Sequence, residues 1–226
     1  MKNNGRYIIE DREQSTIAES FRVLSSTLQE AREGKKVQSV LFTTVSDGES
    51  AVMTAVNTAV TLAYAGKKVI LVDCDMRHPI LNDIFDLEVF GITNIILQGK
   101  TIEPMIQRSG INRLNVLAAG SVAAGAVELL SNKKLQEVFD QLKNFFDYVI
   151  VVSSPLLVGS RKILSDACIV ASKVDGVVLV IPSRAVKTQT ARKAIELLKG
   201  ARANIIGTVL SDVKVDAEMV YYSSVG

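Results

Sequence analysis

The feature that most constrains this chain is a series of short runs rich in Val, Ile and Leu, separated by segments with helical periodicity. Such runs are typical of parallel strands buried on both faces, and the intervening segments are long enough to cross the sheet as helices. Strands and helices are therefore expected to alternate throughout, which predicts an α/β fold, a doubly wound and mostly parallel sheet flanked by helices in three layers. The expected strands cover residues 37–43, 68–72, 114–118, 148–152, 176–181 and 205–210.

The segments between and before these runs predict the helical layers. The first helix should precede the sheet, with Ser15 or Thr16 as its cap. A chain of 226 residues can bury one sizeable core, so residues 1–226 are expected to form a single domain with a short tail over 216–226. The expected helices cover residues 15–32, 55–65, 133–146 and 188–199.

Composition excludes several classes of function. Lys and Arg number 26 against 24 Asp and Glu, which gives no electrostatic reason to expect a nucleic acid as partner. No apolar run reaches the ~18 residues that span a bilayer, and the first residues are too polar for a signal peptide. We therefore expect a soluble, cytoplasmic protein without direct membrane insertion. Cys74 and Cys168 lack metal or redox spacing and are expected to be reduced core residues, and the lone His78 predicts no metal site.

The turn after the first strand is where a sheet of this kind binds phosphate. It reads TVSDGESAVMT over residues 44–54. A working phosphate loop ends in Gly-Lys-Ser/Thr, because the Gly lets the backbone approach, the Lys neutralises charge and the hydroxyl holds magnesium. Those three places here hold Ser50, Ala51 and Val52.

The segment from residue 43 to residue 79 resembles the Walker A and Walker A′ region of the CpsD/CapB family of bacterial tyrosine kinases. The blocks GITNIILQG, NVLAAG, VELLSN, FDYVIVVSSP, SDA and DGVVLV follow in the family's order, so the resemblance covers nearly the whole chain. It implies a P-loop NTPase-like fold. The matching positions are Gly48, Glu49, Asn57 and Ala59 in the first motif, and Asp73, Asp75 and Arg77 in the second.

The resemblance also shows what is missing from the expected nucleotide site. The family's Walker B aspartate, which holds the magnesium shell, is replaced by Ser153. Charged hydrogen bonds contribute roughly 1.5–3 kcal/mol each, so losing the Lys and weakening the metal's hold should cost about 100-fold in affinity. The remaining acidic side chains would repel a triphosphate, and neither ATP nor magnesium is expected to bind. These acidic residues are Asp47, Glu49, Asp73 and Asp75.

In the family, the aspartates matched by Asp73 and Asp75 are linked to magnesium handling and to activating the attacking tyrosine hydroxyl. Here we interpret them as relics of that chemistry, and we expect Arg77 to form an ion pair with one of them.

Two further matches concern assembly and modification. Glu19 and Arg22 match the first two positions of a motif that assembles rings in the family, but Ser25 occupies the third, so a solvated helix face is the alternative. Tyr221 and Tyr222 resemble the tyrosine-rich tail that the family phosphorylates, with a frayed apolar end as the alternative.

Three functions are compatible with these observations. The leading hypothesis is a pseudokinase, a catalytically inactive binding or regulatory module in capsule or exopolysaccharide synthesis. It would be recruited to the inner face of the plasma membrane by a membrane-anchored co-polymerase or adaptor, or it would pair with an active homologous kinase or with itself. The alternatives are an active ATP-dependent tyrosine autokinase and a nucleotide switch of the MinD/ParA type, although residues 43–52 lack the extra Lys of that type.

Overall fold

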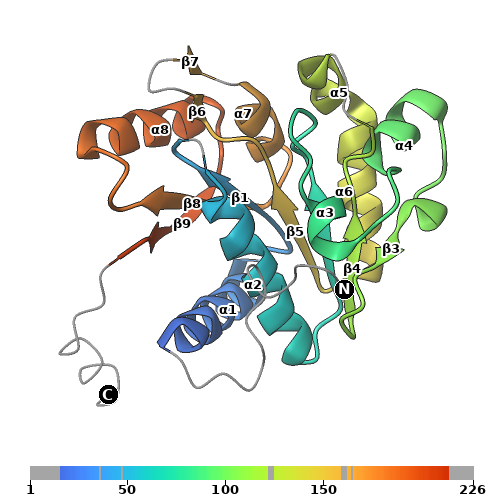
Figure 1. The fold of residues 1–226 in the computed structure, drawn as a ribbon, viewed down its shortest axis with the longest axis horizontal. Helices are drawn as coiled ribbons and strands as arrows, with labels where there is room; N and C mark the ends of the chain where they lie inside the picture. The colour runs from blue at the N-terminus through green and yellow to red at the C-terminus, as the bar shows by residue number, and fades with distance from the viewer. Residues whose placement is uncertain are drawn as a thin grey trace.

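The computed structural model describes residues 16–35, 37–46, 48–121, 125–158, 162–163 and 165–213. Within these residues the chain forms nine strands, of which seven belong to one sheet and two to a separate hairpin (Figure 1). The strands are β1 (Ser39–Thr44), β2 (Val69–Asp73), β3 (Gln107–Arg108), β4 (Leu114–Leu117), β5 (Tyr148–Val152), β6 (Leu157–Val158), β7 (Lys162–Ile163), β8 (Gly176–Pro182) and β9 (Ile205–Ser211).

The sheet has the order β3-β4-β2-β5-β1-β8-β9, and every pair in it is parallel except β3 with β4. This confirms the predicted doubly wound, mostly parallel sheet. The expectation that strands and helices alternate throughout was wrong in two places. Among the described elements, no helix lies between β3 and β4, between β5 and β6 or between β6 and β7, and the β3–β4 and β6–β7 pairs are antiparallel.

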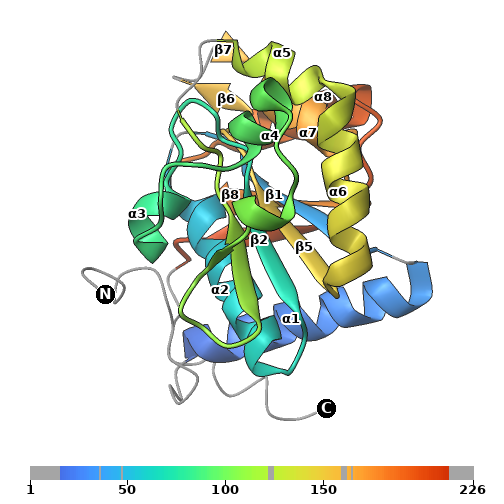
Figure 2. The ribbon, with the colours of Figure 1, turned by 90° about the vertical axis from the view of Figure 1, so that its right-hand side faces the viewer.

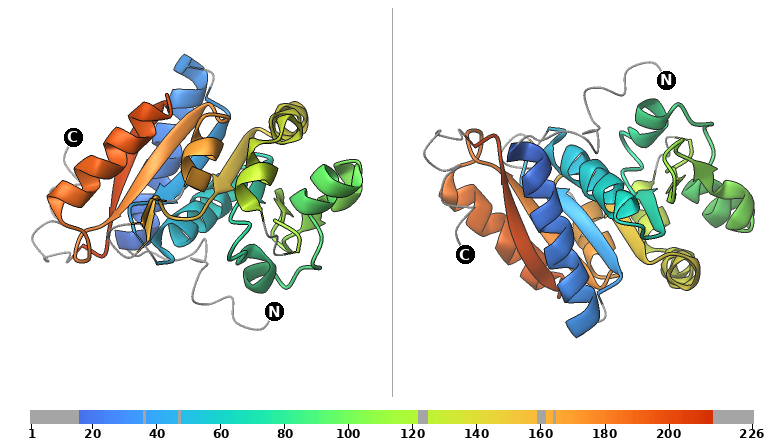
Figure 3. Two further views of the ribbon diagram at one scale, coloured as in Figure 1. Left: turned by 90° about the horizontal axis from the view of Figure 1, so that it is seen from above. Right: turned by 90° about the horizontal axis from the view of Figure 1, so that it is seen from below.

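Helices cover both faces of the sheet. Figure 3 shows α1 and α2 in front of the sheet in its right panel, and α7 and α8 in front of the opposite face in its left panel. The helices are α1 (Thr16–Lys35), α2 (Ser50–Tyr64), α3 (Leu81–Phe85), α4 (Ile92–Gln98), α5 (Ala126–Ser131), α6 (Lys133–Phe145), α7 (Ser165–Ala171) and α8 (Thr188–Gly200), with a short 3-10 helix η2 (Glu103–Met105).

The core consists of two apolar clusters separated by the sheet, because successive side chains of a strand point to opposite faces. In β5, Tyr148, Ile150 and Val152 belong to the cluster that contains α2, whereas Val149 and Val151 belong to the cluster that contains α6 and α8. Figure 2 shows α2 and α6 on different sides of the strands. The predicted strand runs were hydrophobic on both faces for this reason.

Helix α2 begins at Ser50, five residues before the expected start at residue 55. It is buried although it contains several polar side chains. Thr54, Thr58 and Thr61 each donate to the carbonyl oxygen four residues earlier, at 2.6–2.7 Å, so their hydroxyls are satisfied within the helix. Among the described helices, none is both long and apolar enough to cross a membrane.

Candidate functional site

Three segments meet at the carboxyl ends of the neighbouring strands β1, β5 and β2. They are the turn before α2, the loop after β2 and the Ser153–Ser154 segment after β5. Backbone hydrogen bonds hold them together: Cys74 N donates to Val152 O at 2.8 Å, and Leu156 N donates to Thr44 O at 2.9 Å. This is the edge at which a doubly wound sheet presents its ligand site.

The first turn of α2 contains Ser50, Ala51 and Val52, the three residues that stand where a phosphate loop carries Gly-Lys-Ser/Thr. Gly48 has φ 131°, a conformation open to glycine, and Glu49 is the N-cap residue without a side-chain capping hydrogen bond. Ser50 Oγ lies 3.4 Å from Thr44 Oγ1. The side chains of Ala51 and Val52 pack in or against the apolar cluster on the α2 side of the sheet, and Ala51 is only 2% exposed.

Asp73 is the last residue of β2, and it is fully buried. Its carboxylate accepts three backbone hydrogen bonds, from the N–H groups of Asp75, Ile80 and Leu81 at 2.9–3.2 Å. Burial raises the pKa of Asp73 to about 7, and these N–H groups only partly offset that effect. The carboxylate therefore organises the loop of residues 74–81 from inside.

Asp75 has the same kind of role nearer the surface, because its Oδ1 accepts from the N–H groups of Arg77 and His78 at 3.1 and 3.0 Å. The expected ion pair between Arg77 and one of these two aspartates was wrong. Arg77 instead donates through Nε and Nη2 to the two carboxylate oxygens of Asp166 in α7, at 2.6 and 3.3 Å. The Asp166 side chain is only 2% exposed, so its charge needs a partner, whereas the carboxylate of Asp73 already accepts three backbone hydrogen bonds.

The segment after β5 contributes hydroxyls rather than a carboxylate. Ser153 Oγ donates to Ser154 O at 3.1 Å, and Thr43 Oγ1 donates to the same carbonyl at 3.2 Å. Ser154 is 1% exposed, and within the described residues its Oγ has no hydrogen-bond partner. The polar groups at this point are therefore neutral.

The other predicted positions lie away from this edge or outside the described residues. Glu19 and Arg22 form an exposed ion pair of 3.0 Å with each other on α1, and Ser25 is buried. Cys74 is buried, whereas Cys168 is only partly buried, and both are free thiols. The described residues do not include Asp47, Tyr221 or Tyr222.

Sequence reasoning missed the role of Asp166, which lies 89 positions from its partner Arg77. A signal was present, because Asp166 is the centre of the SDA block that matches the family pattern. A polar residue in an otherwise apolar helix start indicated a buried partner, but nothing in the local sequence identified it.

Comparison with known proteins gives consistent results. The model of a family described as an AAA domain matches residues 45–214. The chain is 32% identical to tyrosine-protein kinase YwqD of Bacillus subtilis over 210 residues, which cover 92% of this chain and 86% of that protein.

Solved structures include two informative neighbours. The chimerical protein CapA2B2 is 29% identical, with a TM-score of 0.80 over 88% of this chain and 86% of the other. The septum site-determining protein MinD of Pyrococcus horikoshii, solved with Mg-ADP, has a TM-score of 0.60 at 18% identity, over 82% of this chain and 76% of that one. The second likeness concerns the fold alone and supports the P-loop NTPase-like architecture.

Proposed function

The chain belongs to the CpsD/CapB family of bacterial tyrosine-protein kinases, and from this premise we propose that it is a catalytically inactive member. Its role would be that of a binding or regulatory module in capsule or exopolysaccharide synthesis. The fold is that of the family, so the proposal depends on the side chains at the candidate site.

The observation that carries the proposal is the absence of a cationic side chain from the phosphate turn itself and from the strand and helix that flank it. Residues 37–66, which contain β1, the turn and all of α2, include no lysine or arginine. The nearest candidate on the loop after β2 is Arg77, and its guanidinium is already paired with the buried Asp166. A triphosphate bound at the start of α2 would therefore meet helix amides and carboxylates, with no neutralising side chain from β1, the turn or α2.

The side chains also do not fit a magnesium ion. Magnesium prefers six oxygen ligands in octahedral geometry, and Val52 and Ala51 offer none. The oxygens of Asp73 are occupied by three backbone N–H groups, and a pKa near 7 leaves that carboxyl partly protonated at neutral pH. These features support the proposal that Asp73 and Asp75 are structural braces of the loop rather than metal ligands.

Isothermal titration calorimetry with ATP or ADP, each with magnesium, tests the proposal. We expect no binding at micromolar nucleotide. A variant that combines Ser50→Gly, Ala51→Lys, Val52→Thr and Ser153→Asp restores the family's residues, and we expect it to gain at least about 100-fold in affinity. Micromolar binding by the unaltered chain would overturn the proposal.

The alternative is an active tyrosine autokinase, and the raised pKa of Asp73 is the observation that favours it, since a carboxylate of that pKa suits a general base. Incubating the full chain with ATP and magnesium distinguishes the two functions by mass spectrometry. The alternative predicts phosphate on Tyr221 or Tyr222, lost in Asp73→Asn. Our proposal predicts none unless an active kinase is added.

The same proposal includes partners. We propose that the chain is held at the inner face of the plasma membrane by a membrane-anchored co-polymerase or adaptor, or that it assembles with an active homologous kinase. The exposed Glu19–Arg22 pair on α1 is the proposed contact for assembly with other copies. Neither nucleic acid nor a bound cofactor has a role in this scheme.

A further inference from the structure

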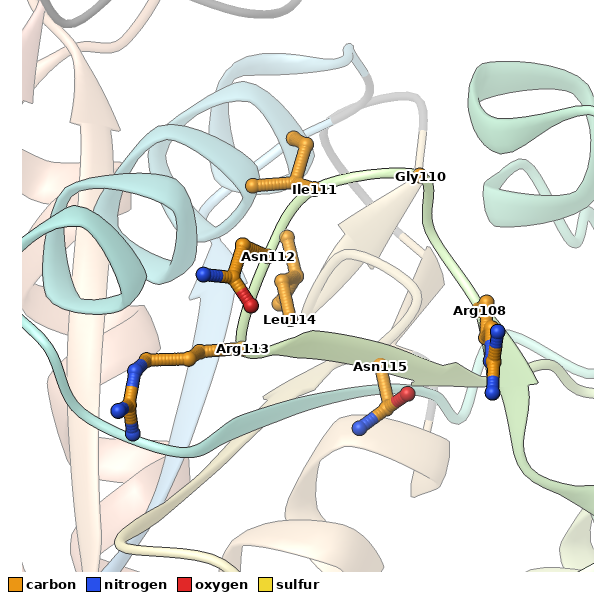
Figure 4. A pocket seen from close by; sticks show the side chains of 7 residues that line it. All are labelled: Arg108, Gly110, Ile111, Asn112, Arg113, Leu114 and Asn115. Carbon is orange, nitrogen blue, oxygen red and sulfur yellow. The ribbon is translucent and has the colours of Figure 1, made fainter.

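A polar cavity lies at the amino end of β4, at the edge of the sheet opposite to the phosphate turn. It has a volume of about 450 Å³ and is formed by the β3–β4 connection. Figure 4 shows Arg113 and Arg108 on opposite sides of this cavity, with Asn115 between them. The residues that line it are Arg108, Gly110, Ile111, Asn112, Arg113, Leu114 and Asn115.

The connection that forms the cavity is internally braced. Ser109 is buried, and its Oγ donates to Leu114 O at 2.7 Å and accepts from Ile111 N at 3.0 Å. The carbonyl of Arg113 accepts from Val69 N at 2.9 Å, which ties the connection to the start of β2. The polar side chains around the cavity therefore extend from a fixed backbone, so that little ordering is needed for a ligand to bind.

Pairing in the sheet places these side chains on a common face. Arg108 in β3 lies directly opposite Asn115 in β4, and residues paired across two strands point to the same side. Asn112 and Arg113 come just before β4 and reach the same cavity from the turn (Figure 4). Two guanidinium groups and two carboxamides thus line one hollow.

The side chains of Arg108, Asn112, Arg113 and Asn115 are available to a ligand. Within the described part of the chain, none of them makes a side-chain hydrogen bond or an ion pair, whereas Arg32 pairs with Asp147 and Arg77 pairs with Asp166. A guanidinium matches the geometry of a carboxylate or phosphate, and a carboxamide both donates to and accepts from hydroxyls.

We propose that this cavity binds a small polyhydroxylated anion, an acidic sugar or a sugar phosphate. Arg108 and Arg113 hold the carboxylate or phosphate group, and Asn112 and Asn115 hold the hydroxyls. The volume suits a ligand of one or two sugar rings rather than an extended polymer. The site is independent of the phosphate turn, so the inference stands whether or not nucleotide binds there.

The test is an NMR titration of the ¹⁵N-labelled full chain with glucuronate, glucose 1-phosphate, glucose and inorganic phosphate in parallel. We expect saturable shifts at residues 108–115 with glucuronate or glucose 1-phosphate, and a dissociation constant of about 1 mM or tighter. Glucose lacks the anion and inorganic phosphate lacks the hydroxyls, so both should bind at least tenfold more weakly.

Variants identify the groups that act. Replacing both arginines, Arg108→Gln with Arg113→Gln, should weaken binding at least tenfold. Arg113→Lys keeps the positive charge but loses the paired N–H donors of the guanidinium, so it should weaken binding less. Arg192→Gln, on the exposed side of α8, is the matched control and should change nothing. Thermal unfolding checks that each variant folds, which is expected because both arginines are exposed.

Three results would overturn the proposal. The first is an absence of saturable shifts with either anionic sugar. The second is binding that the double arginine variant leaves unchanged. The third is a response at residues 108–115 to an acidic peptide such as oligoglutamate but to neither sugar, which would make the cavity a protein-docking site.

Discussion

Asp73 and Asp175 lie at opposite ends of the sheet, and both carboxylates accept hydrogen bonds from backbone N–H groups of neighbouring segments. Asp73, at the carboxyl end of β2, is fully buried and has another carboxylate, Asp75, as its neighbour. Asp175 immediately precedes β8, and its Oδ1 lies 3.3 Å from Lys143 Nζ. The difference between the two ends is therefore the cation.

The pKa values of the two carboxyl groups are shifted in opposite directions. Burial raises the pKa of Asp73 to about 7. Burial would raise the pKa of Asp175 too, but the N–H groups of Ser39 and Gln38 and the nearby Lys143 together lower it. Asp175 therefore has a cation beside it, whereas the described residues place no cation against Asp73. The proposed replacement of a phosphate-binding lysine by Ala51 would produce this difference.

The largest expected effect concerns Asp73. A folded-state pKa of about 7 against an ordinary value of 3.8 means that the folded chain keeps a proton that the unfolded chain has released. Asp73 should therefore destabilise the fold progressively as pH rises from about 4 to about 7, by up to about 4 kcal/mol. Relative to the unaltered chain, Asp73→Asn should gain stability by that amount over this interval.

Urea unfolding of the two proteins at several pH values measures this gap. Asp83→Asn makes the same chemical change at an exposed position of α3 and serves as the control. If the difference in unfolding free energy between Asp73→Asn and the unaltered chain stays constant with pH, burial does not raise the pKa of Asp73. That result would contradict the comparison between Asp73 and Asp175.

The second effect is smaller and has the opposite sign. Asp175 accepts from Gln38 N at 3.0 Å and Ser39 N at 2.8 Å, so Asp175→Asn should cost about 2 kcal/mol of unfolding free energy at neutral pH. Because the pKa of Asp175 is lowered, its contribution is present above about pH 4 and is lost as pH falls through the lowered pKa. The deficit of the variant should shrink on acidification, and a constant deficit would contradict the comparison.

Much of the fold was predictable because its strands are buried on both faces. The run over residues 148–152 matches β5 at both ends, and the other predicted strands agree with the observed ones within two residues. Strand β3 was missed because two residues carry no local pattern and become a strand only by pairing with β4. The start of α2 was missed because we expected the turn to extend further, whereas Gly48 completes it within a few residues.

The site was predictable in position and not in its interactions. Asp73 and Asp75 lie where the motif indicated, after a buried strand at the ligand edge of the sheet. Both carboxylates accept from backbone N–H groups of their own loop, but the pairing of Arg77 with Asp166 depends on how distant segments pack and could not be deduced from spacing. A local signal for Asp175 did exist, since it immediately precedes a buried strand, as Asp147 does before β5.

The smallest expected effect concerns Lys143, the cation beside Asp175. Lys143 is in the last turn of α6 and contacts Asp175 and, at the same distance of 3.3 Å, the exposed Asp140. Lys143→Met should cost about 1 kcal/mol at neutral pH, since the pair is only partly buried. Lys199→Met removes a charge from the equivalent turn of α8 and controls for the helix dipole.

A double-mutant cycle that combines Lys143→Met with Asp175→Asn separates the pair from its surroundings. If the cation accounts for the difference between the two ends, the two changes should be less costly together than the sum of their separate costs. Lys143→Met alone should also move the acid-induced loss of the Asp175 contribution to higher pH, toward the behaviour of Asp73. Additive costs and an unmoved acid transition would instead assign the low pKa of Asp175 to the N–H groups of Gln38 and Ser39, leaving burial and backbone geometry as the difference between the two ends.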